Sequence, residues 1–273
     1  MIKSLSLWRN SALFGLAILG VVSTVLAIAG ISLYDLFSDI KWTSRLGIIS
    51  ITYVFIVLFI LMFKICKGKK GVAFLIRGIT VEIKQGDIFE ANDWKLIPFN
   101  EYFDTQVDNI IISRSSLNGQ FIDKVEKNGG LAALKDAIIN ECSSPFKGIE
   151  MDNGKVKYPM GCIKRFNEFM LLSFAHFDQQ NEARSSWGEY EMCLRNMWKE
   201  IGRIYAGTPI NLPLVGGGIT RFDGNTEKPN MYLLRSMLWT LRTSDVQLNQ
   251  PITILLTKKA MQEISLYNLK GEM

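Results

Sequence analysis

Histidine and paired cysteines are nearly missing from this chain of 273 residues. It has one histidine, His176, and four scattered cysteines without a CxxC pair. Zinc sites need Cys or His ligands that converge at recognisable spacing, so the sequence predicts no metal site. A Ser-His-Asp or Cys-His site would have to use His176. An apolar run such as 169–177 more often ends in a packed, hydrogen-bonded histidine than in a base, so we predict no catalytic residues of these kinds.

An excess of positive charge is missing from residues 71–273. This segment holds 23 Lys and Arg against 24 Asp and Glu, whereas residues 1–70 hold eight against two. Binding of nucleic acid without regard to sequence requires a basic surface. The composition therefore argues against a nucleic-acid partner. The positive charge of residues 1–70 instead favours contact with the anionic headgroups of a lipid bilayer.

Charged residues are also missing from two long apolar runs, Ser11–Tyr34 and Leu46–Phe63. At about 1.5 Å per helical residue, these runs would extend roughly 36 and 27 Å, close to the ~30 Å hydrocarbon core of a bilayer. A buried helix of a soluble protein rarely runs this long without a polar face. We therefore predict two transmembrane spans, at about 11–34 and 46–65.

The flanking charges predict how this transmembrane hairpin, residues 1–70, is oriented. Basic residues precede the first span and follow the second, whereas the connector 35–45 holds two residues of each sign. Positive residues are retained on the cytoplasmic side. We expect a multi-pass protein of the cell inner membrane, with both termini and the domain 71–273 in the cytoplasm. In a rival interpretation the first span is a cleaved signal peptide that follows Lys3 and Arg9.

Predicted strands and helices alternate in the second domain. Runs of β-branched residues beside glycine turns predict strands, and apolar residues at steps of three and four predict helices. The strands are expected at 72–77, 79–84, 166–177, 210–214 and 252–256, and the helices at 130–142, 185–207, 231–241 and 261–269. Ser185 or Ser186 can cap the helix 185–207. This alternation indicates an α/β sandwich around a mostly parallel or mixed sheet.

Three glycines follow the strand predicted at 210–214. Gly216, Gly217 and Gly218 would let backbone N–H groups approach an anion closely, because a Cβ would block that approach and because glycine reaches φ > 0. Neither a Gly-Lys-Ser/Thr nor a GxGxxG pattern is present. Binding of a diphosphate and a plain flexible turn are both open interpretations of this segment.

Two other polar segments are candidates to contact the same ligand. Asp87 follows the strand 79–84, where a carboxylate can accept a hydrogen bond from an exocyclic amine; a simple Asp turn is the alternative. Residues 96–105 are interpreted as a loop of polar and aromatic groups, with an ordinary surface loop as the alternative. Ser115 and Ser116 are expected to cap the next helix or to contact a sugar hydroxyl.

Together these segments resemble the macro domain, a module that binds ADP-ribose and related nucleotides. The resemblance covers most of residues 72–260 and implies a three-layer α/β/α sandwich with a mixed sheet, preceded here by the two-helix hairpin. It implies that Asp87 meets the adenine amino group and that the glycine loop wraps the diphosphate. The family's Asn-Ala-Ala-Asn segment is replaced here by Pro98–Asp104. The implied ligand-binding residues are Asp87, Ile88, Asn100, Glu101, Asp104, Asn118, Gly119, Leu214, Gly216, Gly217, Gly218, Ile219, Thr220 and Phe222.

The pairing of two transmembrane helices with this divergent macro domain resembles the membrane effectors of the bacterial Thoeris anti-phage system. That resemblance implies a sensor that uses no cofactor. A partner TIR-domain enzyme would make an ADP-ribose-derived signal, for which a histidine conjugate of ADP-ribose is one candidate. The macro domain would bind this signal, and the protein would form a homo-oligomer that disrupts the membrane, which arrests growth or kills the cell.

Two other classes of function stay open. One is a membrane-anchored ADP-ribosyl or nucleotide hydrolase, in which Asn100, Glu101 and Asp104 position a water molecule. The other is a structural anchor that binds a partner and no nucleotide. In that case a bulky substitution of Gly217 would leave the function unchanged.

Overall fold

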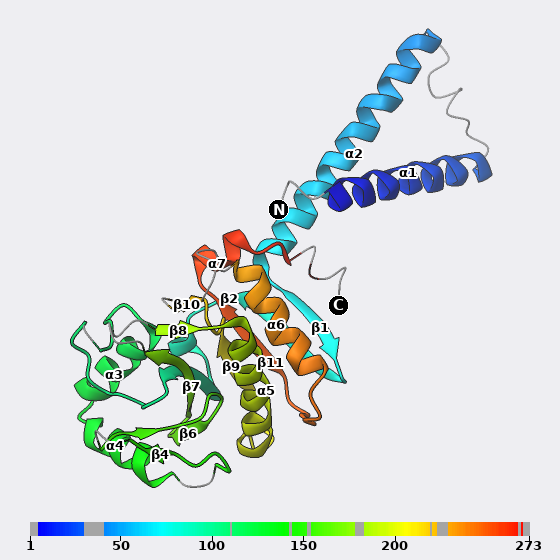
Figure 1. The fold of residues 1–273 in the computed structure, drawn as a ribbon. Helices are drawn as coiled ribbons and strands as arrows, with labels where there is room; N and C mark the ends of the chain where they lie inside the picture. Colours follow the sequence, from blue (N-terminus) through cyan, green and yellow to red (C-terminus); the bar gives the residue numbers. More distant parts are fainter. Residues whose placement is uncertain are drawn as a thin grey trace. The chain divides into compact units, whose positions relative to one another are not determined.

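The computed structural model describes most of the chain (Figure 1). The described residues are 5–29, 41–109, 111–141, 144–151, 154–177, 183–218, 220–222, 229–266 and 269. The chain divides into one unit of residues 1–71 and 265–273 and a second unit of residues 72–264. The expected domains, 1–70 and 71–273, stay a prediction.

Two long apolar helices dominate the described part of the first unit. They are α1 (Leu5–Ile28) and α2 (Trp42–Lys70). By length and composition, Trp8–Ile28 and Trp42–Phe63 are each apolar enough to cross a membrane, and few of their residues are buried. The helices contact each other through Tyr53, whose hydroxyl donates a 3.1 Å hydrogen bond to a backbone carbonyl of α1.

A mixed sheet of nine strands forms the centre of the second unit. Its strands are β1 (Val72–Ile76), β2 (Ile79–Gln85), β3 (Trp94–Asn100), β6 (Ile163–Phe166), β7 (Phe169–Phe177), β8 (Ala183–Ser185), β9 (Ile210–Pro213), β10 (Arg221–Phe222) and β11 (Ile252–Leu256). The order is β1-β2-β11-β9-β3-β7-β8-β10, with β6 also paired to β7. Neighbours from β2 to β7 run parallel, whereas β1 is antiparallel to β2 and both β6 and β8 are antiparallel to β7. A separate small sheet pairs β4 (Ile149–Glu150) with β5 (Val156–Lys157).

Helices cover both faces of the large sheet. They are η2 (Ile88–Glu90), α3 (Leu117–Lys127), α4 (Leu131–Asn140), α5 (Trp187–Ile204), α6 (Asn230–Arg242) and α7 (Lys258–Glu263). Leu171 of β7 packs in a cluster with Phe121 of α3 and Leu134 of α4. Its neighbours Met170 and Leu172 are also fully buried. Successive side chains of a strand point to opposite faces of the sheet, so Met170 and Leu172 lie on the face opposite Leu171. Helix α5 covers that second face, because it contacts β7, and α6 packs beside α5. The expected three-layer α/β/α sandwich with a mixed sheet is confirmed.

Most predicted elements occur within a few residues of the expected positions. The long helix is capped by Ser186, one of the two expected serines, whose hydroxyl accepts a 3.2 Å hydrogen bond from the backbone N–H of Glu189. The strand expected at 166–177 is β7, which begins only at Phe169 because the chain turns at Asn167, where φ is 50°, between β6 and β7. The last predicted helix begins earlier than expected, because Thr257 caps α7.

The interpretation of residues 96–105 as a loop is wrong in its first part, where β3 runs through the middle of the sheet. Pro98 hides this strand in the sequence, because proline cannot donate to a ladder and is rare in central strands. The structure tolerates Pro98 because β3 pairs with β9 only at Trp94 and Lys95, while β7 pairs along the rest of its length. Beyond Lys95, the backbone of β3 forms no strand pairing on the side of β9 within the described residues.

Candidate functional site

A cavity of about 470 Å³ lies at the carboxyl ends of the parallel strands. Its lining includes Asp87 after β2, Thr257 after β11, Leu214 after β9 and Asn100 at the end of β3. The chain continues from β3 to α3 and from β9 to α6, and the two helices lie in different layers. Open α/β sheets bind ligands at such a switch point, in pockets of roughly 300–1,000 Å³.

Asp87 and Ile88 form the part of the wall that follows β2. Asp87 caps the short helix η2, because its Oδ1 accepts a 2.9 Å hydrogen bond from the backbone N–H of Phe89. The simple Asp turn considered as an alternative is therefore present. This residue is exposed, and its second carboxylate oxygen has no partner among the described residues, so it is available to a ligand.

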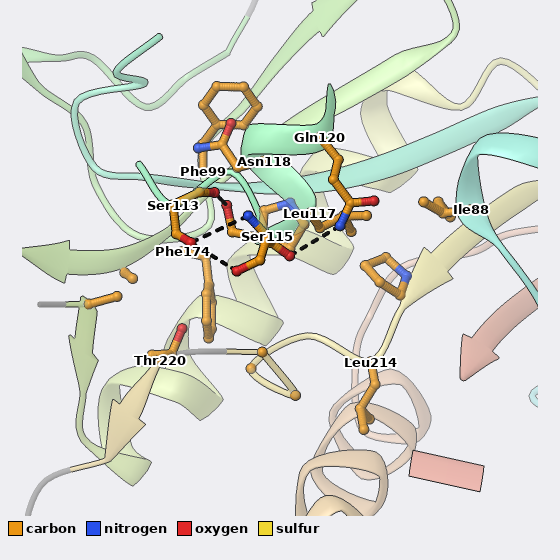
Figure 2. A pocket seen from close by; sticks show the side chains of 18 of the residues that line it. Ile88, Phe99, Ser113, Ser115, Leu117, Asn118, Gln120, Phe174, Leu214 and Thr220 are labelled. Atoms are coloured by element: carbon orange, nitrogen blue, oxygen red, sulfur yellow. Dashed lines mark hydrogen bonds between the residues drawn. The ribbon is translucent and has the colours of Figure 1, made fainter. Parts of the chain in front are cut away.

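The start of helix α3 forms a second wall (Figure 2). Ser116 caps the helix: its hydroxyl accepts a 3.0 Å hydrogen bond from the Gly119 N–H and donates one of 2.6 Å to the Ser113 carbonyl. The hydroxyls of Ser113 and Ser115 are 2.9 Å apart. The side-chain oxygen of Asn118 is buried and has no hydrogen-bond partner in the described part of the chain. Because a helix N-terminus attracts anions, this wall suits a phosphate.

The glycine loop after β9 forms a third wall, and Figure 2 shows Leu214 and Thr220 across the cavity from the start of α3. Gly216 has a φ of 79°, and a β-carbon there would lie 3.3 Å from the side chains of Leu233 and Phe174. A β-carbon on Gly218 would meet no atom within 4 Å in the described part of the chain. The backbone thus requires glycine at position 216, whereas glycine at position 218 leaves open space.

Residues 100–104 form a polar turn in which Asn100 alone lines the cavity. Its Oδ1 accepts a 3.0 Å hydrogen bond from the backbone N–H of Asp104, and its Nδ2 donates one of 2.8 Å to the Asp104 carboxylate. The other carboxylate oxygen of Asp104 lies 2.9 Å from the ammonium group of Lys155. Asn100 and Asp104 therefore hold the turn in its shape.

Glu101 is buried outside the cavity lining and binds two basic side chains. Its carboxylate contacts Nδ1 of His176 and lies 3.0 Å from the ammonium group of Lys157. Nε2 of His176 is 3.2 Å from Glu189. Burial raises the pKa of Glu101, but the hydrogen bonds with His176 and Lys157 outweigh it and lower the pKa overall. The hydrogen bond with Glu101 raises the pKa of His176, against the opposing effect of burial. His176 is hydrogen-bonded, as predicted, although a third of its side chain is exposed.

The structure places the predicted ligand-binding residues in three groups. The cavity lining includes Asp87, Ile88, Asn100, Asn118, Leu214, Gly216, Gly217, Gly218 and Thr220. Outside the lining are Glu101, Asp104, Gly119 and Phe222. Gly119 serves packing, because a β-carbon there would lie 2.2 Å from the Ser113 carbonyl oxygen, and the ring of Phe222 packs on Trp187 and Tyr190. Ile219 lies outside the described residues.

Other residues of the lining escaped the sequence reasoning. Phe99 and Phe174 look like ordinary core residues of two buried strands, and Ser113 lies in an irregular segment. Thr257 had a usable signal, because it directly follows the predicted strand 252–256, and ligands gather at the carboxyl ends of such strands.

The lining is suited to a neutral or anionic ligand held by dipoles. Among the described residues of the lining, Asp87 alone carries a formal charge. No group of three or more His, Cys, Asp or Glu side chains that could hold a metal occurs in the described part of the chain. A phosphate here would therefore be held by backbone N–H groups, hydroxyls and the dipole of α3. Phe99, Phe174 and Leu255 offer apolar contact to a flat ring.

A family model described as "Thoeris protein ThsA, Macro domain" matches residues 81–257. The Thoeris protein ThsA of Bacillus amyloliquefaciens (strain Y2) is 36% identical over an alignment of 259 residues, and the match covers 91% of this chain and 87% of that protein. Among solved structures, a mutant macrodomain of Oceanobacillus iheyensis covers 74% of this chain and 95% of its own, with 16% identity and a TM-score of 0.46. The same macrodomain with ADP matches at 15% identity, with 74% and 98% coverage and a TM-score of 0.43.

Proposed function

Because this chain belongs to the Thoeris ThsA macro-domain family, we propose that it is an anti-phage effector whose cavity senses an ADP-ribose-derived nucleotide. The observation that carries this proposal is the cavity at the carboxyl edge of the sheet. There the start of α3 lies opposite a glycine loop, and the buried amide oxygen of Asn118, in the first turn of α3, has no partner in the described part of the chain. This combination suits a diphosphate with polar sugar groups better than it suits an apolar ligand.

Each part of ADP-ribose has a counterpart in the lining. The second carboxylate oxygen of Asp87 would accept a hydrogen bond from the adenine amino group, with Leu255 in apolar contact. The diphosphate would lie between the start of α3 and Gly218, where no β-carbon obstructs it. The second ribose would extend toward Asn100 at the end of β3.

The amide of Asn118 supports this arrangement. A buried polar atom without a hydrogen bond costs about 1–3 kcal/mol, which a donor on the ligand would recover. A sugar hydroxyl can donate to Oδ1 of Asn118 as the side chain stands. If the side-chain amide is flipped by 180°, its NH₂ group can donate to a phosphate instead, because the oxygen and NH₂ groups of an amide have nearly the same shape and can exchange places.

We propose that α1 and α2 anchor this sensor in the cell inner membrane. Their length and composition support a span for each, and the basic residues outside both ends support cytoplasmic termini. The macro domain would then sample nucleotides in the cytoplasm. A soluble messenger could reach the cavity there without crossing the bilayer.

The messenger would come from a partner TIR-domain enzyme, and a histidine conjugate of ADP-ribose is the first compound to test. Binding promotes assembly only if the oligomer holds the messenger more tightly than the monomer does. Under that condition the messenger would drive homo-oligomer formation, membrane disruption and growth arrest.

Hydrolysis of the ligand is the second candidate function, and the contacts of its proposed residues disfavour it. The carboxylate of Glu101 is bound by His176 and Lys157, and that of Asp104 by Lys155 and Asn100. A carboxylate that activates water as a general base must lie within reach of the ligand. Neither carboxylate lines the cavity.

Isothermal titration calorimetry of the full chain in detergent micelles tests the proposed function. ADP-ribose and its histidine conjugate should each give a saturable heat with one site per chain. Inorganic phosphate alone should bind at least ten times more weakly, because it lacks the adenine and ribose contacts. If neither nucleotide binds a protein that still unfolds cooperatively, the proposal is contradicted. Release of ribose phosphate or AMP during the titration would favour the hydrolase.

A further inference from the structure

The edge strand β1 lacks the features that normally keep a sheet edge from pairing. Within the described residues β1 is hydrogen-bonded to β2 alone, so its other side is open. Its five residues, Val72–Ile76, include no charge and no proline. The side chain of Leu75 is 72% exposed. Proteins usually protect such an edge with a charge, a proline, a bulge or a covering segment, and an unprotected edge is a template for another strand.

The geometry of the β1–β2 hairpin determines which backbone groups face outward. Arg77–Gly78 is a two-residue turn with φ values of 51° and 83°. In such a hairpin the residue before the turn, Ile76, exchanges hydrogen bonds with the first residue of β2. Bonding alternates along the strand, so the N–H and C=O groups of Ala73 and Leu75 point to the open side.

A second copy of the same strand fits this edge in antiparallel orientation. When Phe74 lies opposite Phe74 of the second copy, the outward groups of Ala73 face those of Leu75, and each outward N–H meets a C=O. In the same register, the exposed Leu75 side chain of each copy lies beside the small Ala73 side chain of the other copy. The five residues of β1 carry no charge, so no like charges meet when two copies of the strand pair.

We propose that β1 is the contact through which the macro domains of this protein assemble, by antiparallel pairing with β1 of a second copy. This inference rests on the proposed function, since it names the surface for the assembly proposed there. Five residues a side are few beside the roughly 20–30 of a standard interface, so the contact is weak between freely diffusing molecules. Only Gly71 separates β1 from the end of α2. A membrane anchor would therefore concentrate these edges in one layer and favour their pairing.

Disulfide trapping in membranes that contain the full chain tests this pairing. Phe74→Cys is introduced after Cys66 and Cys142 are replaced by Ser, and the membranes are mildly oxidised in the presence of ADP-ribose or its histidine conjugate. Directly opposed residues have Cβ atoms about 4.5–5.5 Å apart, close to disulfide range, so most of the protein should run as a dimer. Ile139→Cys, at a 68% exposed position of α4, is the matched control and should stay monomeric. Equal trapping at both positions would overturn the proposal.

A charge introduced at the edge, and its compensation, test the register. Leu75→Glu in the Phe74→Cys protein should lower the trapped dimer several-fold. Adding Ala73→Lys should restore it, because the introduced lysine of each copy faces the introduced carboxylate of the other and lies opposite Glu82 in its own hairpin. Trapping unaffected by Leu75→Glu, or not recovered in the double variant, would contradict this register.

Nucleotide binding separates this inference from the proposed function. The protein with Leu75→Glu alone should bind ADP-ribose with wild-type affinity in calorimetry, because β1 contributes no residue to the cavity. Loss of trapping with retained binding supports the role of β1. Absence of binding in the wild type would refute the proposed function instead, whatever the trapping shows.

Discussion

Substitutions at positions 216 and 218 should have different effects. Gly216 allows a left-handed backbone conformation, whereas Gly218 leaves space in the cavity. In Gly216→Ala, an L-residue must adopt a φ of 79°, and its β-carbon lies 3.3 Å from two packed side chains. The left-handed conformation alone costs roughly 1–2 kcal/mol. For a domain of this size, each kcal/mol lowers the melting temperature by about 2–4 °C, so we expect a loss of about 2–8 °C.

In Gly218→Val the stability should stay within about 0.5 kcal/mol of the wild type, because the β-carbon meets no described atom within 4 Å. The added methyl groups would instead occupy the space proposed for the diphosphate. Loss of one hydrogen bond to a charged group costs about 1.5–3 kcal/mol, which corresponds to roughly a 10- to 100-fold weaker affinity for ADP-ribose.

Thermal unfolding monitored by tryptophan fluorescence gives the stability of both variants, and calorimetry gives their affinity for ADP-ribose. Gly188→Val is the matched control, because a β-carbon there also meets no described atom within 4 Å and the residue lies outside the cavity lining. Its affinity should equal that of the wild type. The reasoning is refuted if Gly218→Val binds like the wild type or if Gly216→Ala melts at the wild-type temperature.

Three further substitutions have defined outcomes. Asp87→Ala removes both the cap of η2 and the proposed adenine contact, so calorimetry should show about tenfold weaker binding, whereas Asp87→Asn should keep the cap and the wild-type melting temperature. Ser116→Ala should destabilise the domain by about 1 kcal/mol in chemical denaturation, because α3 loses its N-cap. The raised pKa of His176 means that its protonated form stabilises the fold fully below about pH 6.5, and this stabilisation is lost as the pH rises through the raised value. The melting temperature should therefore fall more between about pH 6 and pH 9 in the wild type than in His176→Gln; equal slopes would contradict this assignment.

Elements with regular periodicity were predictable from the sequence. The stripe of apolar residues with a serine before it and a glutamate in its first turn located α5, and the β-branched runs located β2 and β11. These signals are local, because a helix face or a strand buries its own residues at a fixed spacing. The glycine loop was also predictable from local sequence, because three consecutive glycines indicate a backbone that other molecules can approach closely.

Elements that depend on distant parts of the chain were not predictable. Pro98 argued against a central strand, and only the pairing of the finished sheet shows that, among the described residues, β9 does not pair with β3 at that position. Asn100, Glu101 and Asp104 lie within five residues of the sequence, yet only Asn100 lines the cavity, because the turn directs the two carboxylates to Lys155, Lys157 and His176. Which polar side chains reach a site depends on such contacts, and a linear pattern does not record them.

A structure of the full chain with bound ADP-ribose or its histidine conjugate, determined by cryo-electron microscopy, would show where the nucleotide lies. We expect the adenine beside Asp87 and the diphosphate between the start of α3 and Gly218. A nucleotide bound elsewhere on the chain, with this cavity empty at saturating concentration, would contradict this expectation.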